Sequence, residues 1–482
     1  LQKNGYRLLM ENKKGLVWLR DDFRTNHNSA LAYASEKHDQ VSTVYIFNPE
    51  DYENKREAQR WWIYHSLINF KQELSKFNIS LELLVGDEVQ VLKKIKTADN
   101  VSLYWNKIPE PEEEKKETKI IKNFEEKNIN YKFFKGNILS EHKEVTKDDG
   151  TPFKVFTPFW RVAEQVYLNK VPPKKSKTKK KNKKIFIFKQ SSDLSKVLPN
   201  KNWFKKFEKY WTPSEIRSGK VLDELIEKKI GNYHKTRDYP SIEGTSKISP
   251  YLKHGQVHVE KIWESCQNIQ NKNTGYRKFV NEIGWREFSH SLINYFPQML
   301  KGNLRKEFDS FPWIENKKNL EAWKKGLTGY SIVDAGMREL YETGWIHNRV
   351  RMIVGSFLVK HLRIHWKEGE KYFRNTLLDF NVANNVASWQ WVAGCGADAA
   401  PYFRIFNPIL QGEKFDKDGT YVKHWVPELK NVPSKFIHRP WEMDDETQKS
   451  INIKIGKDYP LPIVDHAKAR EQALKAFDKI TK

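Results

Sequence analysis

Cysteine is scarce in this chain: Cys266 and Cys395 are the only two among 482 residues. Two thiols cannot form a disulfide framework or a cysteine-rich metal site, and such low usage is typical of a reducing compartment. The sequence also has no clustered histidines, no HExxH motif and no GxGxxG fingerprint. We therefore predict neither a metal ion nor a Rossmann-type dinucleotide motif.

Long apolar runs are missing as well. No stretch approaches the ~20 residues that a membrane-spanning helix requires. The opening LQKNGYRLLMENKKGLVWLR has no signal-peptide apolar region or cleavage site. These absences predict a cytoplasmic protein of bacterial type with no membrane partner.

Positive charge, in contrast, is abundant. Lys and Arg number 85 against 61 Asp and Glu, which gives a net charge of +24. This excess favours a polyanionic partner such as nucleic acid or an anionic surface. A surface that is basic for solubility alone is the alternative that charge leaves open. The length of 482 residues is consistent with two or three domains.

Short apolar runs alternate with helix-like stretches at residues 14–137. The runs GLVWLR, VSTVYIF, LELLVG, VSLYWN and YKFFKG have the composition of buried strands. Strands that alternate with helices predict a parallel α/β domain with right-handed crossovers.

Residues 138–205 are predicted to be a basic interdomain linker. Eight of the eleven residues from Lys174 to Lys184 are lysine. A run of like charge repels itself, so a solvated loop is expected. The run could be a plain linker, or it could add phosphate affinity by counterion release.

A helical pattern covers residues 206–475. WTPSEIR predicts a helix with Thr212 as its N-cap and Pro213 at the first helical position. In GTSKISPYLK, Thr245, Ser246 and Ser249 stand at another predicted helix start, where free N–H groups can bind phosphate. Plain N-capping is the commoner role of such residues.

The stretch from Tyr341 to Pro408 places four tryptophans among Asn, Asp and Arg in a mainly apolar background. Buried polar groups beside large aromatics are costly unless they are paired, so this stretch predicts a pocket for a flat ligand with polar edges. Its strings HNRVRM, DFNVANN, WQW and GADAAPYFRIFNP closely resemble the flavin-binding segment of the DNA photolyase/cryptochrome family. The resemblance runs from about Gly15 to about Arg470 and is closest to class I cyclobutane pyrimidine dimer photolyases.

The resemblance implies a Rossmann-like parallel α/β antenna domain followed by a helical FAD-binding domain, with FAD reduced and anionic in the active state. The positions that match the family's cofactor contacts are Tyr233, Thr245, Ser246, Lys247, Ile248, Ser249, Asn348, Arg351, Asp379, Asn381 and Asn385. Lys247 stands where Arg is usual, so it keeps the charge but loses the forked geometry. Arg351 and Asp379 are expected to pair, because a buried Arg needs a partner. Asn385 is expected at the flavin edge, where plant cryptochromes have Asp.

Further residues match the family's electron-transfer and substrate positions. Trp389, Trp366 and Trp313 match its tryptophan triad. The positions that contact a flipped pyrimidine dimer match Glu282, Trp285, Asn348, Met352 and Trp391. Arg237, Arg349 and Lys414 are expected to contact DNA phosphates. Glu282, Asn348, Met352 and Asn385 are the expected catalytic residues, with Glu282 as a neutral carboxyl that donates to a thymine carbonyl. The (6-4) photolyases typically have His in place of Asn348 and Met352, so a cyclobutane dimer is favoured.

Glu110 and Lys301 match positions that touch a folate in some relatives, which makes 5,10-methenyltetrahydrofolate the expected antenna. The implied function is deoxyribodipyrimidine photolyase: a monomer without an obligate protein partner repairs dimers in UV-damaged DNA by electron transfer from reduced FAD. The alternatives are a cryptochrome-like blue-light receptor and a Trp-rich DNA-binding module without cofactor. Only 482 − 419 = 63 residues follow Gly419, which speaks against a receptor's signalling tail.

Overall fold

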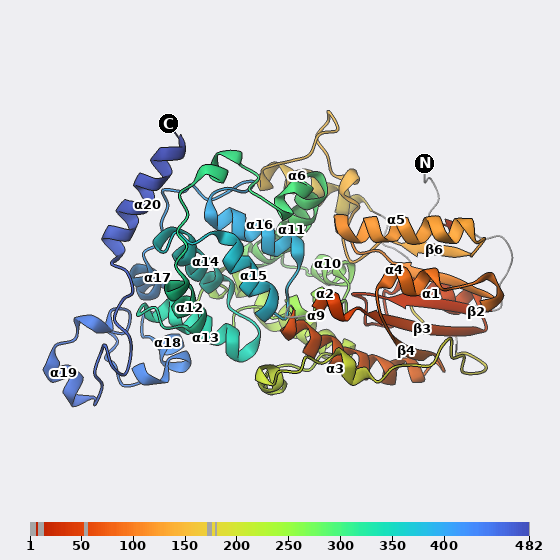
Figure 1. The fold of residues 1–482 in the computed structure, drawn as a ribbon, viewed down its shortest axis with the longest axis horizontal. Coiled ribbons are helices and arrows are strands. Elements are labelled where there is room, and N and C mark those ends of the chain that lie inside the picture. Colours follow the sequence, from red (N-terminus) through yellow and green to blue (C-terminus); the bar gives the residue numbers. More distant parts are fainter. Residues whose placement is uncertain (1–5, 8–13, 53–55, 171–175, 179–180, 482) are drawn as a thin grey trace.

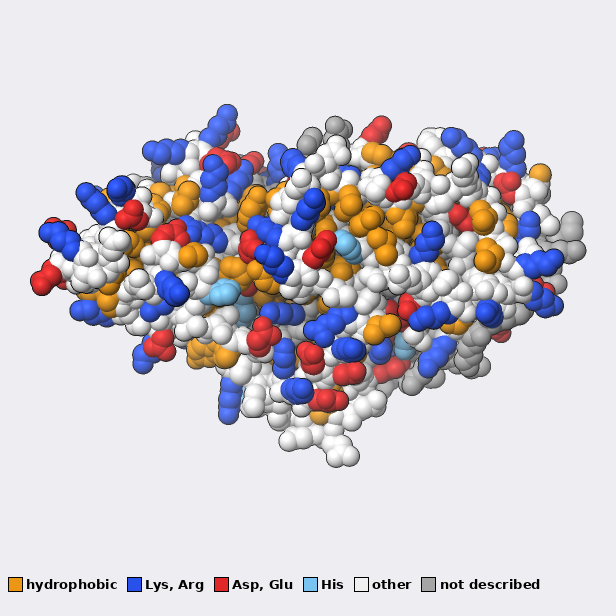
Figure 2. All heavy atoms as spheres, turned by 90° about the horizontal axis from the view of Figure 1, so that it is seen from below, with side chains coloured by type: hydrophobic (Ala, Val, Ile, Leu, Met, Phe, Trp, Pro, Cys, Tyr) orange, Lys and Arg blue, Asp and Glu red, His pale blue; other side chains and the backbone are white. Residues whose placement is uncertain are grey.

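The computed structural model describes residues 6–7, 14–52, 56–170, 176–178 and 181–481. An α/β unit and a larger helical unit lie side by side along the long axis of the molecule (Figure 1). Within these described ranges, no helix is long and apolar enough to cross a membrane. On the face drawn in Figure 2, Lys and Arg side chains are spread over the whole length of the molecule and do not form one block.

The α/β unit is built on one sheet with the strand order β1-β6-β5-β2-β3-β4. Its strands are β1 (Tyr6–Arg7), β2 (Lys14–Leu19), β3 (Gln40–Phe47), β4 (Ser80–Val85), β5 (Val101–Asn106) and β6 (Tyr131–Phe134). The five predicted strands are confirmed and run parallel, whereas β1 was not predicted and pairs antiparallel to β6.

Helices cover both faces of this sheet. One face packs on α1 (Ser29–Lys37) and α3 (Glu57–Ser75), and the other packs on α4 (Glu88–Lys93) and α5 (Pro111–Glu126). A short helix, α2 (Pro49–Tyr52), follows β3. Because both faces are buried, the strands are mainly apolar, and their few polar residues, such as Ser42 and Glu82, are buried as well.

The helical unit has one large core that extends through most of its elements. Its helices are α6 (Phe156–Asn169), α7 (Glu215–Glu224), α8 (Tyr233–Thr236), α9 (Ser249–Lys253), α10 (Val259–Gln267), α11 (Thr274–Tyr295), α12 (Lys317–Lys325), α13 (Ser331–Thr343), α14 (Asn348–Ser356), α15 (Trp366–Thr376), α16 (Val382–Ala393), α17 (Pro408–Phe415), α18 (Thr420–Trp425), α19 (Asp445–Ser450) and α20 (His466–Thr481). Figure 1 shows α11, α14, α15 and α16 grouped in the interior of this unit.

The predicted start of α7 was wrong. The helix begins at Glu215, and Ser214 is its N-cap, with an extended backbone and a hydroxyl that accepts from the Arg217 amide at 3.1 Å. Thr212 is exposed and lies before this cap, and Pro213 lies outside the helix. The sequence offered two hydroxyl residues, and the one followed directly by Glu215 forms the cap, since acidic residues favour a helix N-terminus.

The segment that we predicted to be a linker is more ordered than expected. It contains α6, which buries Phe159 and Trp160 against the helical core. In the lysine run, Lys174, Lys175, Lys179 and Lys180 lie outside the described residues, and the described lysines are exposed. Asn182 is buried between them and donates to the carbonyl oxygens of Val41 and Asn78, so this part of the run is attached to the α/β unit.

Candidate functional site

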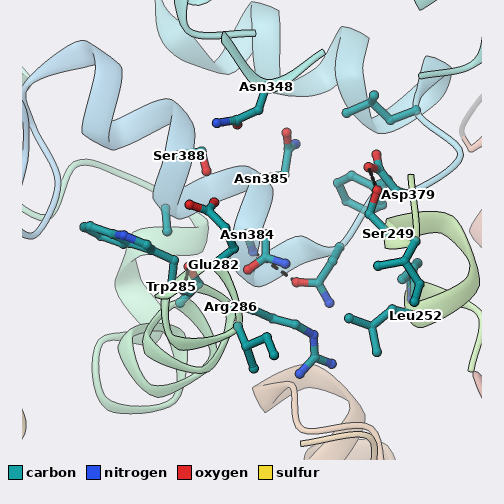
Figure 3. Close-up of a pocket in the computed structure, with 18 of the residues that line it drawn as sticks. Ser249, Leu252, Glu282, Trp285, Arg286, Asn348, Asp379, Asn384, Asn385 and Ser388 are labelled. Carbon is teal, nitrogen blue, oxygen red and sulfur yellow. Dashed lines mark hydrogen bonds between the residues drawn. The ribbon is translucent and has the colours of Figure 1, made fainter. Parts of the chain in front are cut away.

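A cavity of about 650 Å³ lies in the helical unit and extends to the α/β unit. Trp285 lies at one end of it, and Ser249 and Asp379 lie at the other (Figure 3). The polar side chains between them include Glu282, Asn348, Asn384 and Asn385. The volume falls within the ~300–1,000 Å³ of ligand pockets, and the lining combines aromatic surface with polar groups, as expected for a flat ligand with polar edges.

The Asp379 end of the cavity is held together by a short polar network. Asp379 Oδ2 accepts from Arg351 Nη2 at 2.8 Å and from the Ser249 hydroxyl at 2.7 Å. The predicted pairing of Arg351 with Asp379 is therefore present. The other oxygen, Asp379 Oδ1, is buried without a hydrogen-bond partner. A buried acceptor without a partner is costly, so this atom is suited to a ligand's donor.

The loop before α9 lines the same end of the cavity. Thr245, Ser246, Lys247 and Ile248 all contribute to the wall, and Tyr233 of α8 lies beside them. Lys247 has a φ of 50°, a left-handed conformation that non-glycine residues rarely adopt. Its ammonium group pairs with Glu243 at 2.8 Å at the protein surface. The structure thus brings together the predicted phosphate-contacting residues on one loop.

Asn385 is oriented by a neighbour that the sequence did not reveal. Its amide nitrogen donates to Glu370 Oε1 at 3.0 Å and to the Glu370 carbonyl oxygen at 3.2 Å. The carboxylate of Glu370 also accepts from Arg374 at 2.7 Å, which fixes its position. Because the nitrogen is committed to Glu370, the oxygen of Asn385 is the atom available to a ligand. The helix cap is Asn381, whose side chain accepts from the Asn384 amide, so Asn385 itself does not cap α16.

The Trp285 end of the cavity is aromatic. Trp285 stacks on Phe156 of α6 with ring centroids 3.9 Å apart. Asn348, Met352 and Trp391 also line the cavity. The two tryptophans therefore contribute aromatic surface on which a flat guest can pack.

Glu282 is paired with a basic residue at the cavity. Its side chain is about one-third exposed and forms an ion pair with Arg237, which is itself largely buried. Both residues line the cavity, as expected. The donation from Glu282 to a thymine carbonyl stays a prediction.

A second cavity of about 500 Å³ adjoins the first and shares Asp238 and Arg349 with it. Lys414, His234 and Lys235 line it together with the aromatic Tyr239 and Phe415. Arg349 pairs with Asp238 at 3.0 Å and lies over the Phe415 ring at 4.5 Å. Cationic groups interleaved with aromatic rings are typical of nucleic-acid binding surfaces.

Two of the three tryptophans of the predicted electron-transfer chain are buried. Trp389 of α16 lies so close to α15 that a Cβ at Gly369 would fall 2.1 Å from its ring. Trp366 begins α15 and donates to Asn303 at 2.8 Å, while Trp313 is half-buried. Ring contacts link Trp366 to His365 at 5.6 Å and His365 to Trp313 at 4.9 Å.

Trp323 is an aromatic neighbour of this chain that sequence reasoning missed. Its ring centroid lies 6.3 Å from that of Trp389, and its indole donates to the Val354 carbonyl oxygen. No local sequence signal relates Trp323 to Trp389, because the two residues come from separate helices of one packed core.

Only one of the two predicted antenna residues lines a cavity. Glu110 lines the large cavity where it reaches the α/β unit, and burial raises the pKa of its carboxyl. Lys301 is exposed and lines neither cavity, but its charge acts on Glu112, two residues from Glu110. Within the described part of the chain, no cluster of His, Cys, Asp and Glu is arranged to hold a metal ion.

Comparison with known proteins relates both units of this chain to one family. Residues 15–177 match the family model described as DNA photolyase, and residues 279–479 match the FAD binding domain of DNA photolyase. A deoxyribodipyrimidine photo-lyase of Agrobacterium fabrum is 41% identical over 475 residues, which cover 97% of this chain and 98% of that protein. Cryptochrome-2 of Arabidopsis thaliana is 32% identical over 97% of this chain and 79% of its own length.

One solved structure is similar to this chain over almost the whole length of both proteins. It is described as a bacterial class III photolyase from Agrobacterium tumefaciens, with a TM-score of 0.92 and 39% identity over 98% of this chain and 99% of that one. Our expectation named class I as the closest class, whereas this similar structure is described as a class III photolyase.

Proposed function

This chain belongs to the DNA photolyase family, and from that premise we propose that it is a deoxyribodipyrimidine photo-lyase acting on cyclobutane dimers in UV-damaged DNA. The observation that carries the proposal is the continuity of the large cavity. One space joins the Arg351–Asp379 pair and Asn385 to the aromatic end around Trp285. A cofactor and an extruded pyrimidine dimer can therefore lie next to each other.

The residues at the inner end fit FAD. Asp379 Oδ1 has no protein partner and can accept a hydrogen bond from the cofactor, while Asn385 presents its amide oxygen. The loop of residues 245–249 offers hydroxyls, amides and the charge of Lys247 to the phosphates. When bound, reduced FAD would supply the electron that opens the cyclobutane ring and would recover it afterwards. The protein's own contribution is to hold the two reactants together and to set the charge around the flavin.

The outer end fits a flipped pyrimidine dimer. Trp285 and Trp391 provide flat surfaces for the linked rings, and Arg237 holds Glu282 at the rim. Damaged bases are easier to extrude from the duplex than normally paired bases, which contributes to selectivity for the lesion. Asn348 and Met352, rather than two histidines, favour the cyclobutane lesion over the (6-4) lesion. Arg349 and Lys414, at the second cavity, are proposed phosphate contacts.

We also propose a folate antenna near Glu110, which lines the large cavity, with Lys301 outside the cavity lining. The protein is proposed to act as a monomer. The division into residues 14–137, 138–205 and 206–475 remains our proposed domain organisation, with α6 belonging structurally to the helical core.

Light-dependent repair tests the proposed function. The reduced holoprotein is mixed with oligothymidine that contains a cyclobutane dimer, and the recovery of thymine absorbance is followed under blue light and in the dark. Recovery in light alone is the expected result. No recovery with reduced FAD bound would favour a receptor function, which the similarity to plant cryptochromes keeps as the second candidate.

A further inference from the structure

Glu339 is a buried carboxylate behind the cavity wall that the proposed function does not use. It lies on α13, is 7% exposed and does not line either cavity. Its Oε2 atom accepts from the Tyr421 hydroxyl at 2.6 Å and from the His347 backbone amide at 3.2 Å. One oxygen therefore links three elements: α13, α18 and the residue that precedes α14.

His347 is the N-cap of α14, so its placement determines where that helix begins. Its Nδ1 atom accepts from the Arg349 amide at 3.2 Å, and its side chain is buried. The first two turns of α14 carry Asn348, Arg349, Arg351 and Met352, all of which line the large cavity. A shift of His347 would thus move the groups proposed to contact both the dimer and the cofactor.

Tyr421 is a fixed anchor for this contact. Asp416 accepts from the Tyr421 amide at 2.9 Å and from the Val422 amide at 3.0 Å, which fixes the start of α18. The turn between α13 and α14 has further ties, because Thr343 bonds to Trp345 and Arg351 donates to the Ile346 carbonyl oxygen. None of these other ties reaches α18, so the link to that helix depends on Glu339.

We propose that Glu339 is a positioning residue: anchored by Tyr421, it fixes the start of α14 and so places Asn348, Arg349 and Met352 at the lesion end of the cavity. The expected effect on dimer binding rests on the proposed function, because it requires that a dimer binds at the lesion end of the cavity. Burial raises the pKa of Glu339 to about 7. The other titratable or charged groups that act on it are Tyr421 of α18, Lys247 of the loop before α9 and Arg351 of α14.

The chain contains a matched control for this contact. Tyr459 donates to Asp334 Oδ2 at 2.6 Å, and Asp334 also lies on α13. Tyr421→Phe and Tyr459→Phe each remove one buried tyrosine–carboxylate hydrogen bond to the same helix. Only the first variant loosens the contact to His347.

The experiment compares these two variants, Glu339→Ala and the conservative Glu339→Gln as FAD-bound proteins. Amide hydrogen exchange of residues 344–352 reports on the start of α14, and the Kd for a dimer-containing oligothymidine reports on the lesion pocket. In Tyr421→Phe we expect exchange and Kd each to rise about fivefold, the effect of one hydrogen bond. Repair at saturating dimer should be unchanged. Glu339→Ala should raise the exchange rate and the Kd by more than fivefold. Glu339→Gln should have values closer to those of the wild type. Tyr459→Phe should change neither quantity.

Two results would overturn the inference: equal behaviour of Tyr421→Phe and Tyr459→Phe, or faster exchange without any change in Kd. Failure of the proposed function gives a different result, because the wild type itself would then not bind the dimer. In that case the visible spectrum of bound FAD replaces Kd as the second readout, since Arg351 on α14 pairs with Asp379.

Discussion

Asn385 shows how a single amide can be set by its surroundings. The amide nitrogen of Asn385 donates to Glu370, whose carboxylate also accepts from Arg374. The amide oxygen of Asn385 is therefore left to contact the cofactor. At the proposed cofactor site, the neutral amide of Asn385 adds no charge next to the flavin. The pair formed by Arg351 and Asp379 sets the charge on another side of the cavity.

Asn385→Asp should make bound FAD harder to reduce. A carboxylate about 5 Å from an anionic reduced flavin would disfavour it by roughly 3 kcal/mol at an effective dielectric constant near 20. The midpoint potential of the bound cofactor, measured by spectroelectrochemistry, should fall accordingly. Asn384→Asp is the control, since Asn384 lines the same cavity. An equal shift in the control would mean that only the net charge of the cavity matters.

Trp389→Phe should abolish photoreduction of oxidised FAD and leave repair by chemically reduced protein largely intact. Trp389 is buried against Gly369 and is the first of the proposed electron donors, and phenylalanine is a much poorer donor. Transient absorption of the flavin after a light pulse measures the effect. Trp323→Phe serves as the comparison, because its ring also contacts Trp389. Normal photoreduction in Trp389→Phe would remove this residue from the chain.

Trp285→Ala should weaken binding of a dimer-containing oligonucleotide by about 1–3 kcal/mol, the scale of one base–aromatic stack. The substitution also exposes the Phe156 ring that packs on Trp285, so the thermal unfolding midpoint must be recorded alongside the Kd. Trp263→Ala, at a buried position outside both cavities, controls for loss of packing. Similar affinities for wild type and Trp285→Ala would exclude Trp285 from the lesion pocket.

Motif reasoning identified the cavity residues at the level of single positions, because their types and order are local properties of the sequence. It missed Glu370, Trp323 and Glu339. Each acts through a contact between elements, and no pattern along the chain encodes such a contact. The ion pair of Glu282 was missed for the same reason, since its partner Arg237 lies 45 residues away, directly after α8.

At the scale of elements, the start of α7 gives a direct stability test. Ser214→Ala should lower the free energy of unfolding by about 1 kcal/mol, because the Arg217 amide loses its acceptor. Thr212→Ala is the matched control at the cap position that the sequence suggested, and it should have a much smaller effect. Urea unfolding followed by circular dichroism measures both variants. The larger loss in Thr212→Ala would reverse the assignment of the cap.

The strands of the α/β unit could be predicted well because each is a short, mainly apolar run between polar segments. Helix boundaries were less predictable where several cap residues are adjacent, as at residues 212–214. Helix α6 was missed because its sequence lies between irregular segments and its apolar face packs on the distant helices α10 and α11. The anchoring of Asn182 to Val41 likewise depends on tertiary contact.

At the scale of the whole molecule, Glu339 links stability to pH. Burial raises the pKa of Glu339 to about 7 from its ordinary value of 4.5. Between these two values the folded chain keeps a proton that the unfolded chain has released. The contribution of this group is therefore fully present below pH 4.5 and is lost as the pH rises through 7.

Glu339→Gln removes this dependence, because an amide does not titrate. The free energy of unfolding of the variant minus that of the wild type should therefore increase from pH 5 to pH 8. The full pKa shift corresponds to an increase of up to about 3 kcal/mol. The buried histidines His254 and His347 have pKa values lowered to about 4, so they act in the opposite direction in both proteins and cancel in the difference. Urea unfolding of the two proteins at both pH values gives the difference directly. A difference that is the same at pH 5 and pH 8 would show that Glu339 keeps one protonation state across this range.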